Sequence, residues 1–169
     1  MKRTIKIIFN TLATLSFRKI LKLLRLTIPH PLFSILAFYA TTKSFVLAQK
    51  QFPKTSATSG IGNAYRHSLW TCLILMYCSK ISSPEKALNF CARMTNMHEE
   101  LFPNEPLEKK MDLHNNQVGM NLFMELLPGI HRQFFETSFF QEKLLEKLKT
   151  AKILKNIDDD FDGDLIYLE

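Results

Sequence analysis

Polar residues follow one another at helical spacing in the segment around residue 66. They stand at positions i, i+3, i+4 and i+7: Asn63, Arg66, His67 and Trp70. This spacing puts all four on one face of a helix, while the other sides of the segment are apolar, so the helix should be largely buried. A buried arginine or histidine needs partners, because unpaired burial of polar groups is costly. Other segments should therefore bring polar groups to this face.

Two later segments carry suitable partners. The helix expected over 110–127 repeats the same spacing with acidic, amide and glycine positions: Asp112, Asn115, Asn116 and Gly119. The glycine lets a backbone or a ligand approach closely. The helix expected over 84–100 ends in His98, Glu99 and a second glutamate. We expect the three helices to form one polar wall, in which Asp112 and Glu99 neutralise Arg66 and the histidines act as proton carriers.

General acid–base hydrolysis is the first chemistry that fits these residues. A histidine, His67 or His98, would activate water or a nucleophile, and a carboxylate, Glu99 or Asp112, would orient the imidazole. Cationic, amide and aromatic side chains would bind an anionic substrate. The candidate substrate-binding residues are Asn63, Arg66, Trp70, Asn115 and Asn116.

A divalent metal site and a structural polar core are the other two interpretations. The candidate metal ligands are His67, His98, Glu99, Asp112 and His114. However, His98-Glu99 lacks the HExxH spacing of a zincin, and His114 lies on a different helix face from Asp112. In the structural interpretation an Arg66–Asp112 pair and the asparagines fix the helix packing without chemistry. Spacing leaves all three interpretations open.

Three sequence blocks carry a resemblance to a known family. They are GNAYRHSLW (62–70), HEELFPNE (98–105) and MDLHNNQVG (111–119). They resemble an uncharacterised bacterial domain family that has an NAxRHxxW segment, an HE pair and an MDLHNNxxG segment. The resemblance spans roughly residues 60–125. It implies a helical domain, found alone or at the ends of larger toxin-like or surface-associated proteins, and it implies no established reaction.

The acidic C-terminal segment has the spacing of an EF-hand calcium loop. Its candidate oxygen ligands surround Gly163: Asp158, Asp160, Asp162, Asp164 and Glu169. No helix follows Glu169 to hold it, and no second hand is present. The alternative is an acidic turn that leads into a short extended segment, 165–168.

Helical signals dominate the rest of the chain. Helices are expected over 31–51, 64–80, 84–100, 110–127 and 137–155, after an amphipathic N-terminal helix that includes Ile8, Leu12 and Phe17. Pro31 and Pro84 suit first helical turns, and Ser83 suits an N-cap. We expect an all-α fold, a compact bundle of about five to six helices with a short C-terminal extended segment. It forms one domain, with basic amphipathic helices (1–52), a motif-bearing core (60–157) and an acidic tail (158–169).

Charge is distributed unevenly. Twelve Lys or Arg residues precede the first acid, Glu85, and the rest of the chain has ten Lys or Arg against sixteen acids, a net charge of −6. A basic amphipathic helix is typical of an anionic membrane surface. Nucleic acid is a less favoured partner because only the charge suggests it. Secretion is also less favoured, because Lys6 and Asn10 interrupt the N-terminal apolar run and no cleavage site follows.

Together these features predict a hydrolase-like protein that acts on a phosphate-bearing or lipid substrate at the cytoplasmic face of a membrane. The location would be cytoplasmic, peripheral on the inner membrane. The alternative is a non-enzymatic, membrane-associated or partner-binding module whose polar core is structural. Three cysteines without a CxxC pair argue against a disulfide framework and a zinc knuckle.

Overall fold

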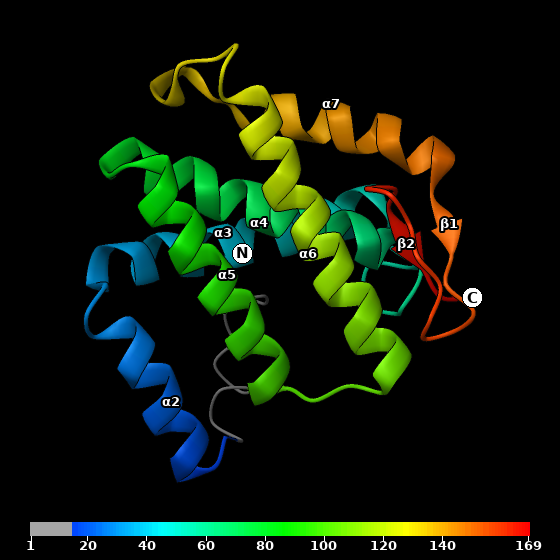
Figure 1. The fold of residues 1–169 in the computed structure, drawn as a ribbon, viewed down its shortest axis with the longest axis horizontal. Coiled ribbons are helices and arrows are strands. Elements are labelled where there is room, and N and C mark those ends of the chain that lie inside the picture. The colour runs from blue at the N-terminus through cyan, green and yellow to red at the C-terminus, as the bar shows by residue number, and fades with distance from the viewer. Residues whose placement is uncertain (1–14) are drawn as a thin grey trace.

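Six α-helices dominate the computed structural model, which describes residues 15–169 (Figure 1). Their bounds are α2 Phe17–Thr27, α3 Pro31–Gln51, α4 Ile61–Ile81, α5 Pro84–Leu101, α6 Pro106–Leu126 and α7 Thr137–Lys147. Two 3-10 turns, η1 (Arg132–Phe134) and η2 (Leu148–Thr150), flank α7. The predicted all-α bundle is confirmed. The Ile8 and Leu12 part of the predicted N-terminal helix lies outside the described residues.

Helix α4 is the centre of the bundle. It packs against α3, α5, α6 and α7, and α5 and α6 cross it in Figure 1. It is buried on nearly all sides, as its apolar sequence predicts. Contact with α6 is closest at Gly119, where an added Cβ would lie 2.2 Å from the carbonyl oxygen of Ser68 and from Thr71 Oγ1. The predicted close approach at Gly119 is therefore made by the backbone of α4.

Proline and capping residues set most helix starts. Pro31, Pro84 and Pro106 each stand in the first turn of a helix, where the missing N–H costs no hydrogen bond. Ser83 caps α5 by accepting from the backbone N–H of Lys86 at 3.3 Å. The predicted start of α6 near residue 110 is too late, because Pro106 already begins the helix.

The C-terminal part of the fold corrects one helix boundary. The helix predicted over 137–155 ends at Lys147, and after η2 the chain forms β1 (Lys152–Ile153). This strand pairs in parallel with β2 (Ile166–Tyr167). The pairing buries Leu154 and Ile166 against Met111, and this burial explains why the chain leaves the helix. The predicted extended segment at 165–168 is present.

Helix α3 is the one helix in the described part of the chain whose length and composition would suffice to cross a membrane. Its second half packs on α4 and α7. There Lys43 Nζ donates to Tyr77 Oη at 3.0 Å and to Thr137 Oγ1 at 2.8 Å. Its first half, next to α2, is more exposed.

Candidate functional site

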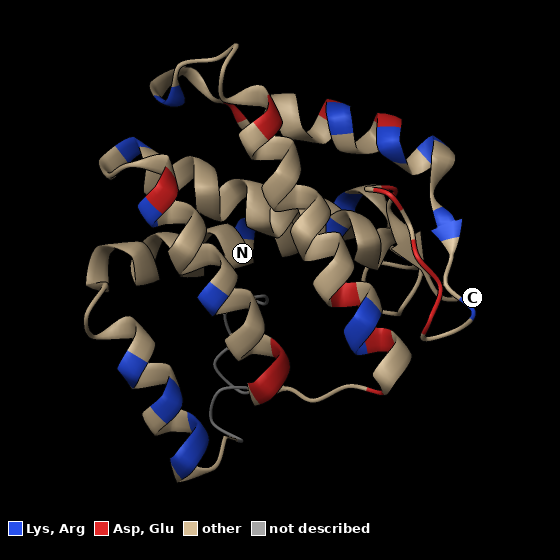
Figure 2. Cartoon of the chain, viewed as in Figure 1, with Lys and Arg blue, Asp and Glu red and all other residues tan. Residues whose placement is uncertain are grey.

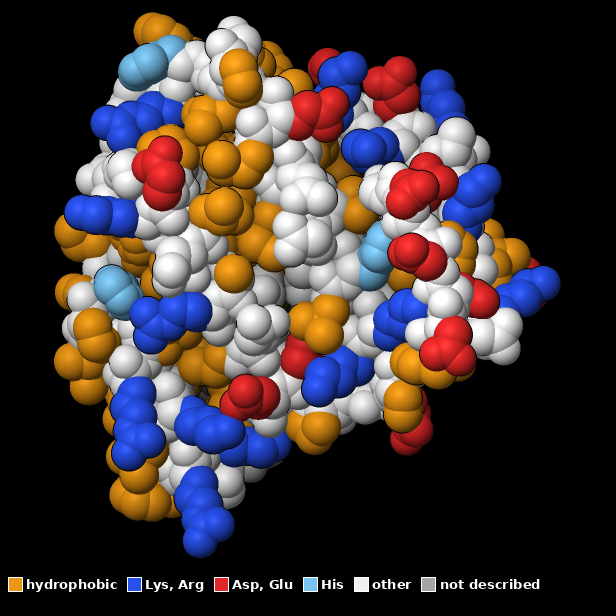
Figure 3. Space-filling view, in the orientation of Figure 1, with side chains coloured by type: hydrophobic (Ala, Val, Ile, Leu, Met, Phe, Trp, Pro, Cys, Tyr) orange, Lys and Arg blue, Asp and Glu red, His pale blue; other side chains and the backbone are white. Residues whose placement is uncertain are grey.

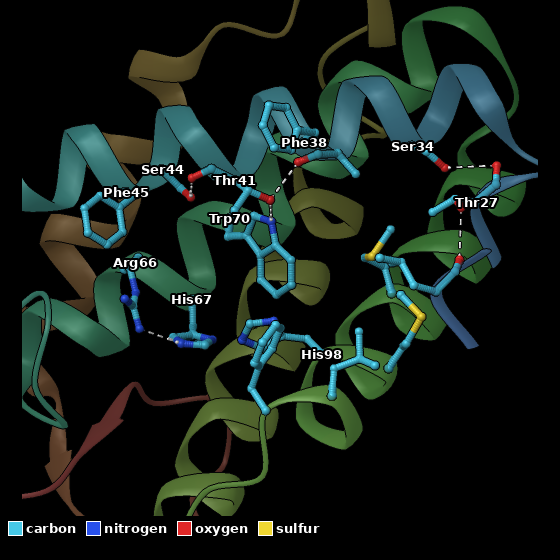
Figure 4. Close-up of a pocket in the computed structure, with 16 residues that line it drawn as sticks. Thr27, Ser34, Phe38, Thr41, Ser44, Phe45, Arg66, His67, Trp70 and His98 are labelled. Atoms are coloured by element: carbon cyan, nitrogen blue, oxygen red, sulfur yellow. Dashed lines mark hydrogen bonds between the residues drawn. The ribbon is translucent and has the colours of Figure 1, made fainter. Parts of the chain in front are cut away.

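A cavity of about 430 Å³ lies between α2, α3, α4 and α5. Its walls are mostly apolar and include Leu23, Phe38, Phe45, Trp70, Met97 and Leu101. Figure 4 shows that Arg66 and His67 stand near one end, with His98 close by, whereas Thr27 and Ser34 stand at the other. Three of the predicted functional side chains therefore meet on the polar side of an apolar chamber.

His67 is held on both ring nitrogens. Arg66 Nη2 lies 3.0 Å from Nε2, and because a guanidinium only donates, Nε2 accepts. The Nδ1–H then donates to Asn116 Oδ1 at 3.3 Å. Burial, followed by the charges of Arg66 and His98, lowers the pKa of His67 well below its usual value. His67 is therefore a neutral, firmly positioned ring at neutral pH.

His98 has a different environment. It stands in the last turn of α5 and lines the cavity. Its ring packs against Trp70, with 5.3 Å between centroids, and against Phe102, at 5.1 Å. Neither ring nitrogen makes a hydrogen bond to any residue within 15–169. Burial, with a smaller effect of Arg66, lowers the pKa of His98 to about 4. His98 is thus a neutral base with free nitrogens at the cavity wall.

Arg66 supplies the positive charge of the site. Its Nη2 donates to Asn63 Oδ1 at 2.7 Å as well as to His67, and its guanidinium carbon lies 6.0 Å from the centre of the Phe45 ring. Burial lowers the pKa of Arg66 and Asp112 opposes that effect, but an arginine remains cationic. The predicted direct pairing of Arg66 with an acid is not observed among the described residues. His67 lies between them, and its Nε2 is 3.4 Å from Asp112 Oδ1.

The two carboxyl groups lie behind the cavity wall. Glu99 is 2% exposed and Asp112 is 3% exposed. Asp112 Oδ2 accepts from Asn104 Nδ2 at 3.2 Å. Neither oxygen of Glu99 has a hydrogen-bond partner in the described part of the chain, so Glu99 does not orient a histidine as predicted. Asp112 Oδ1 lies 3.4 Å from His67 Nε2, but it too has no hydrogen-bond partner in the described chain, so Asn116 rather than a carboxylate orients His67.

Burial controls the protonation of both carboxyl groups. It raises the pKa of Asp112 to about 7, against the opposing charge of Arg66. It also raises the pKa of Glu99 to about 7, and the charge of Asp112 adds to this effect. Each of the two carboxyl groups therefore titrates near neutral pH. Groups that titrate there are suited to acid–base chemistry.

The amides predicted to bind substrate have unequal roles. Asn63 and Asn116 support Arg66 and His67, respectively. Asn115 instead binds the backbone of Ile166, accepting from its N–H at 3.0 Å and donating to its carbonyl at 2.7 Å. It thereby joins α6 to β2 and does not line the cavity. Trp70, which does line it, donates from Nε1 to Thr41 Oγ1 at 2.8 Å.

The five predicted metal ligands are not gathered in one place. Within residues 15–169 no group of three or more His, Cys, Asp or Glu side chains is arranged to hold a metal ion. His98 faces the cavity, and Glu99 and Asp112 lie behind His67. His114 Nε2 is 2.8 Å from the carbonyl oxygen of Asp164, near the C-terminal loop. The arrangement of these donors in the described residues therefore does not support the metal prediction, and packing places His114 apart from the other four.

The predicted calcium loop is an acidic turn. Asp159, which is not among the predicted ligands, accepts from the backbone N–H of Lys155 at 3.0 Å and of Asn156 at 2.8 Å. Lys110 donates to the carbonyl oxygens of Ile157 and Asp159. Gly163 has a φ of 77° and turns the chain into β2. Backbone and lysine contacts close the loop. Within the described chain the acidic side chains form no group that is arranged to hold a metal ion.

Sequence reasoning missed the walls contributed by α2 and α3. Leu23, Phe38 and Phe45 shape the cavity, but each is an ordinary apolar residue of a helix in the sequence. Thr41 and Ser44 line it as well, and hydroxyl groups within an otherwise apolar helix were the one available signal. Asn104, which bonds to Asp112, sits between two prolines and gave no signal of its own.

The chain belongs to the family described as Domain of unknown function (DUF6973), whose model matches residues 24–152. The matched range contains α3 to α7 and every side chain of the cavity's polar end. Comparisons with curated proteins and with solved structures gave no significant match. The predicted membership of an uncharacterised domain family is therefore confirmed, and the reaction has to be argued from the site.

Proposed function

We propose that this protein is a hydrolase that acts on an amphiphilic substrate with an anionic, phosphate-type head group and an apolar chain. The observation that carries the proposal is the joint placement of a free neutral base, His98, and a cation, Arg66, at the polar side of an apolar cavity. The apolar walls would hold the chain, and the guanidinium would hold the head group. The two sequence blocks that contain these residues, 62–70 and 98–105, would then mark the working site of the family.

Arg66 favours an anionic head group. One of its nitrogens is committed to Asn63 and His67, which fixes the plane of the guanidinium and leaves its other N–H groups for a ligand. A guanidinium matches the geometry of phosphate and carboxylate oxygens. Because the surrounding walls are apolar, the attraction is stronger than it would be in water.

His98 would activate the attacking water. Its free nitrogen takes a proton as the water oxygen attacks the ester carbon or phosphorus, and the bond to the leaving alcohol then breaks. The protonated ring returns the proton to the leaving oxygen. Arg66 stabilises the negative charge that develops on the attacked group. His67, which Asn116 holds in place, positions Arg66 through its 3.0 Å contact.

Ester hydrolysis by the full-length chain tests the proposal. The probes are 4-nitrophenyl decanoate, 4-nitrophenyl acetate and bis(4-nitrophenyl) phosphate. We expect release of nitrophenol from the long-chain or phosphate probe and a loss of about a hundredfold or more in His98→Gln, a typical contribution of a general base. His131→Gln, an exposed histidine outside the cavity, is the matched control and should keep full activity. Equal rates in wild type and His98→Gln, including no release by either, would contradict the proposal.

A non-enzymatic binding module is the second candidate, and the saturation of His67 favours it. Both ring nitrogens of His67 are already used by Arg66 and Asn116, as expected of a structural network. His98→Gln separates the two candidates, while His67→Ala and Asp112→Ala test the structural network. A purely structural cluster predicts that both variants lose several kcal/mol of stability, while His98→Gln changes neither stability nor any rate. A working site predicts that His98→Gln folds as wild type and loses activity.

A further inference from the structure

Exposed apolar side chains are concentrated on the two N-terminal helices. Nine of the twelve large hydrophobic side chains that are exposed in the described part of the chain lie between Phe17 and Tyr39. We call the outer side of this region the α2–α3 face; its principal residues are Phe17, Leu21, Leu24, Ile28, Leu32 and Ile35. Ile28 is 69% exposed and Leu32 is 64% exposed. Clusters of this kind mark interaction surfaces in folded proteins.

Three kinds of side chain occupy different sides of α2. Phe17, Leu21 and Leu24 follow helical spacing and form its exposed apolar side. Leu23 and Thr27 lie on one flank and line the cavity. Arg18 and Arg25 lie on the opposite flank, seven residues apart and therefore on one side of the helix. The apolar side thus stands between a cationic border and the cavity.

All charged residues of α2 itself are basic. The sequence has no acidic residue before Glu85, and Figure 2 shows basic but no acidic residues on α2. Lys22 pairs with Glu100 of α5 at 2.7 Å, and Lys19 donates to the carbonyl oxygen of Leu101. Arg18 and Arg25 form no ion pair with any residue that the structure describes. In the space-filling view, basic side chains border the apolar side chains of α2 (Figure 3).

We propose that the α2–α3 face seats this protein on an anionic lipid bilayer. A bilayer offers apolar depth to the leucine and isoleucine side chains and negative head groups to Arg18 and Arg25. A second copy of the chain fits less well. In a twofold dimer the same face would meet itself, and the unpaired arginines would be brought together.

Seating on a bilayer also gives the cavity a source of ligand. Thr27 of α2 and Ser34 of α3 line the end of the cavity opposite Arg66 (Figure 4). These residues belong to the two helices that form the face, so lipids at the surface would lie beside this end. The supply of substrate rests on the proposed function, whereas the docking does not.

Vesicle flotation with the full-length chain tests the docking. The vesicles are phosphatidylcholine alone, or phosphatidylcholine with 30 mol% phosphatidylglycerol, at about 0.1 M salt. We expect the protein to float with the anionic vesicles at a partition coefficient at least about tenfold above that for neutral vesicles, and to be released by about 1 M salt, which screens surface charges. Equal flotation with both vesicles, or absence from both, would overturn the proposal. Retention at high salt would overturn peripheral docking.

Two pairs of variants locate the surface. Ile28→Asp/Leu32→Asp and Arg18→Glu/Arg25→Glu should each lower the partition coefficient about tenfold or more. Phe134→Asp/Ile157→Asp and Lys149→Glu/Lys155→Glu change exposed residues of the same types elsewhere and should float as wild type. If Ile28→Asp/Leu32→Asp floats as well as the apolar control variant, the α2–α3 face is not the docking surface. A concentration-dependent dimer that Ile28→Asp/Leu32→Asp abolishes would overturn the proposal in favour of a second copy.

Failure of docking and failure of catalysis are distinguishable. Nitrophenyl ester probes are offered in solution, so the loss of activity in His98→Gln does not depend on vesicles. A chain that hydrolyses these probes and does not float keeps the proposed function and loses the bilayer proposal. A chain that floats and does not hydrolyse any probe keeps the bilayer proposal and loses the proposed function.

Discussion

Replacing Glu99 by glutamine should make the protein more stable at alkaline pH and leave its stability nearly unchanged at acid pH. The carboxyl group of Glu99 is 2% exposed, and neither of its oxygens has a partner in the described chain. Burial, with help from the charge of Asp112, raises its pKa to about 7. The folded protein therefore favours the protonated, neutral carboxyl, which glutamine imitates in shape and charge.

The size of the effect follows from the difference between the folded and unfolded pKa. An unfolded glutamate has a pKa of about 4.3. Between that value and about 7 the folded state binds more protons than the unfolded state, so wild-type stability falls as pH rises. One pKa unit corresponds to about 1.4 kcal/mol. The full difference is therefore about 4 kcal/mol, present below pH 4 and lost by pH 8.

Urea unfolding followed by the fluorescence of the single tryptophan, Trp70, measures this difference. We expect the gap between Glu99→Gln and wild type to grow by about 3 kcal/mol from pH 4.5 to pH 8. Glu100→Gln, the exposed neighbour on α5, is the control, and burial should add no such pH dependence there. If the gap for Glu99→Gln is the same at both pH values, Glu99 is not held neutral by burial and our account of the site is wrong.

Three further predictions concern the site and its support. The activity of the wild type should rise with pH as His98 loses its proton near pH 4 and should not fall again from that group, which a pH–rate profile checks; a half-maximal rate near pH 6.5 would contradict its low pKa. Gly119→Ala should cost about 1–3 kcal/mol or more in urea unfolding, because its Cβ meets α4 backbone, whereas Gly129→Ala, whose Cβ would make only an ordinary contact at 3.8 Å with the carbonyl oxygen of Leu126, should cost much less. Asn115→Ala should lose about 2 kcal/mol, with faster amide exchange at Ile166, because two hydrogen bonds disappear; unchanged exchange would refute the role of this side chain.

His67 and His98 differ in their hydrogen bonding for a physical reason. Both are neutral because both are buried, but their neighbours differ. His67 stands one residue from Arg66 on α4 and faces α6, where Asn116 and Asp112 meet it. His98 stands on α5 among aromatic rings. The polar neighbours of His67 therefore occupy both of its ring nitrogens. The aromatic neighbours of His98 leave its ring nitrogens without a hydrogen-bond partner in the described chain.

Local chemistry in the sequence determined the helices and which residues share a face. Proline in the first turns of α3, α5 and α6 and the Ser83 cap act within a few residues, and the i, i+3, i+4, i+7 spacing depends on helix geometry alone. The burial of α4 followed from its apolar composition. The need for Gly119 to admit a neighbour was also visible, although the identity of that neighbour was not.

Tertiary packing decided which faces meet and what fills the space between them. The cavity exists because α2 and α3 stand across from α4 and α5, and no local pattern encodes that distance. Packing placed Glu99 and Asp112 behind the wall, put His67 between Arg66 and Asp112, and turned Asn115 towards β2. The sequence by itself therefore determined the polar residues of the site, and the fold decided that Arg66, His67 and His98 line the cavity while Glu99 and Asp112 are buried behind it.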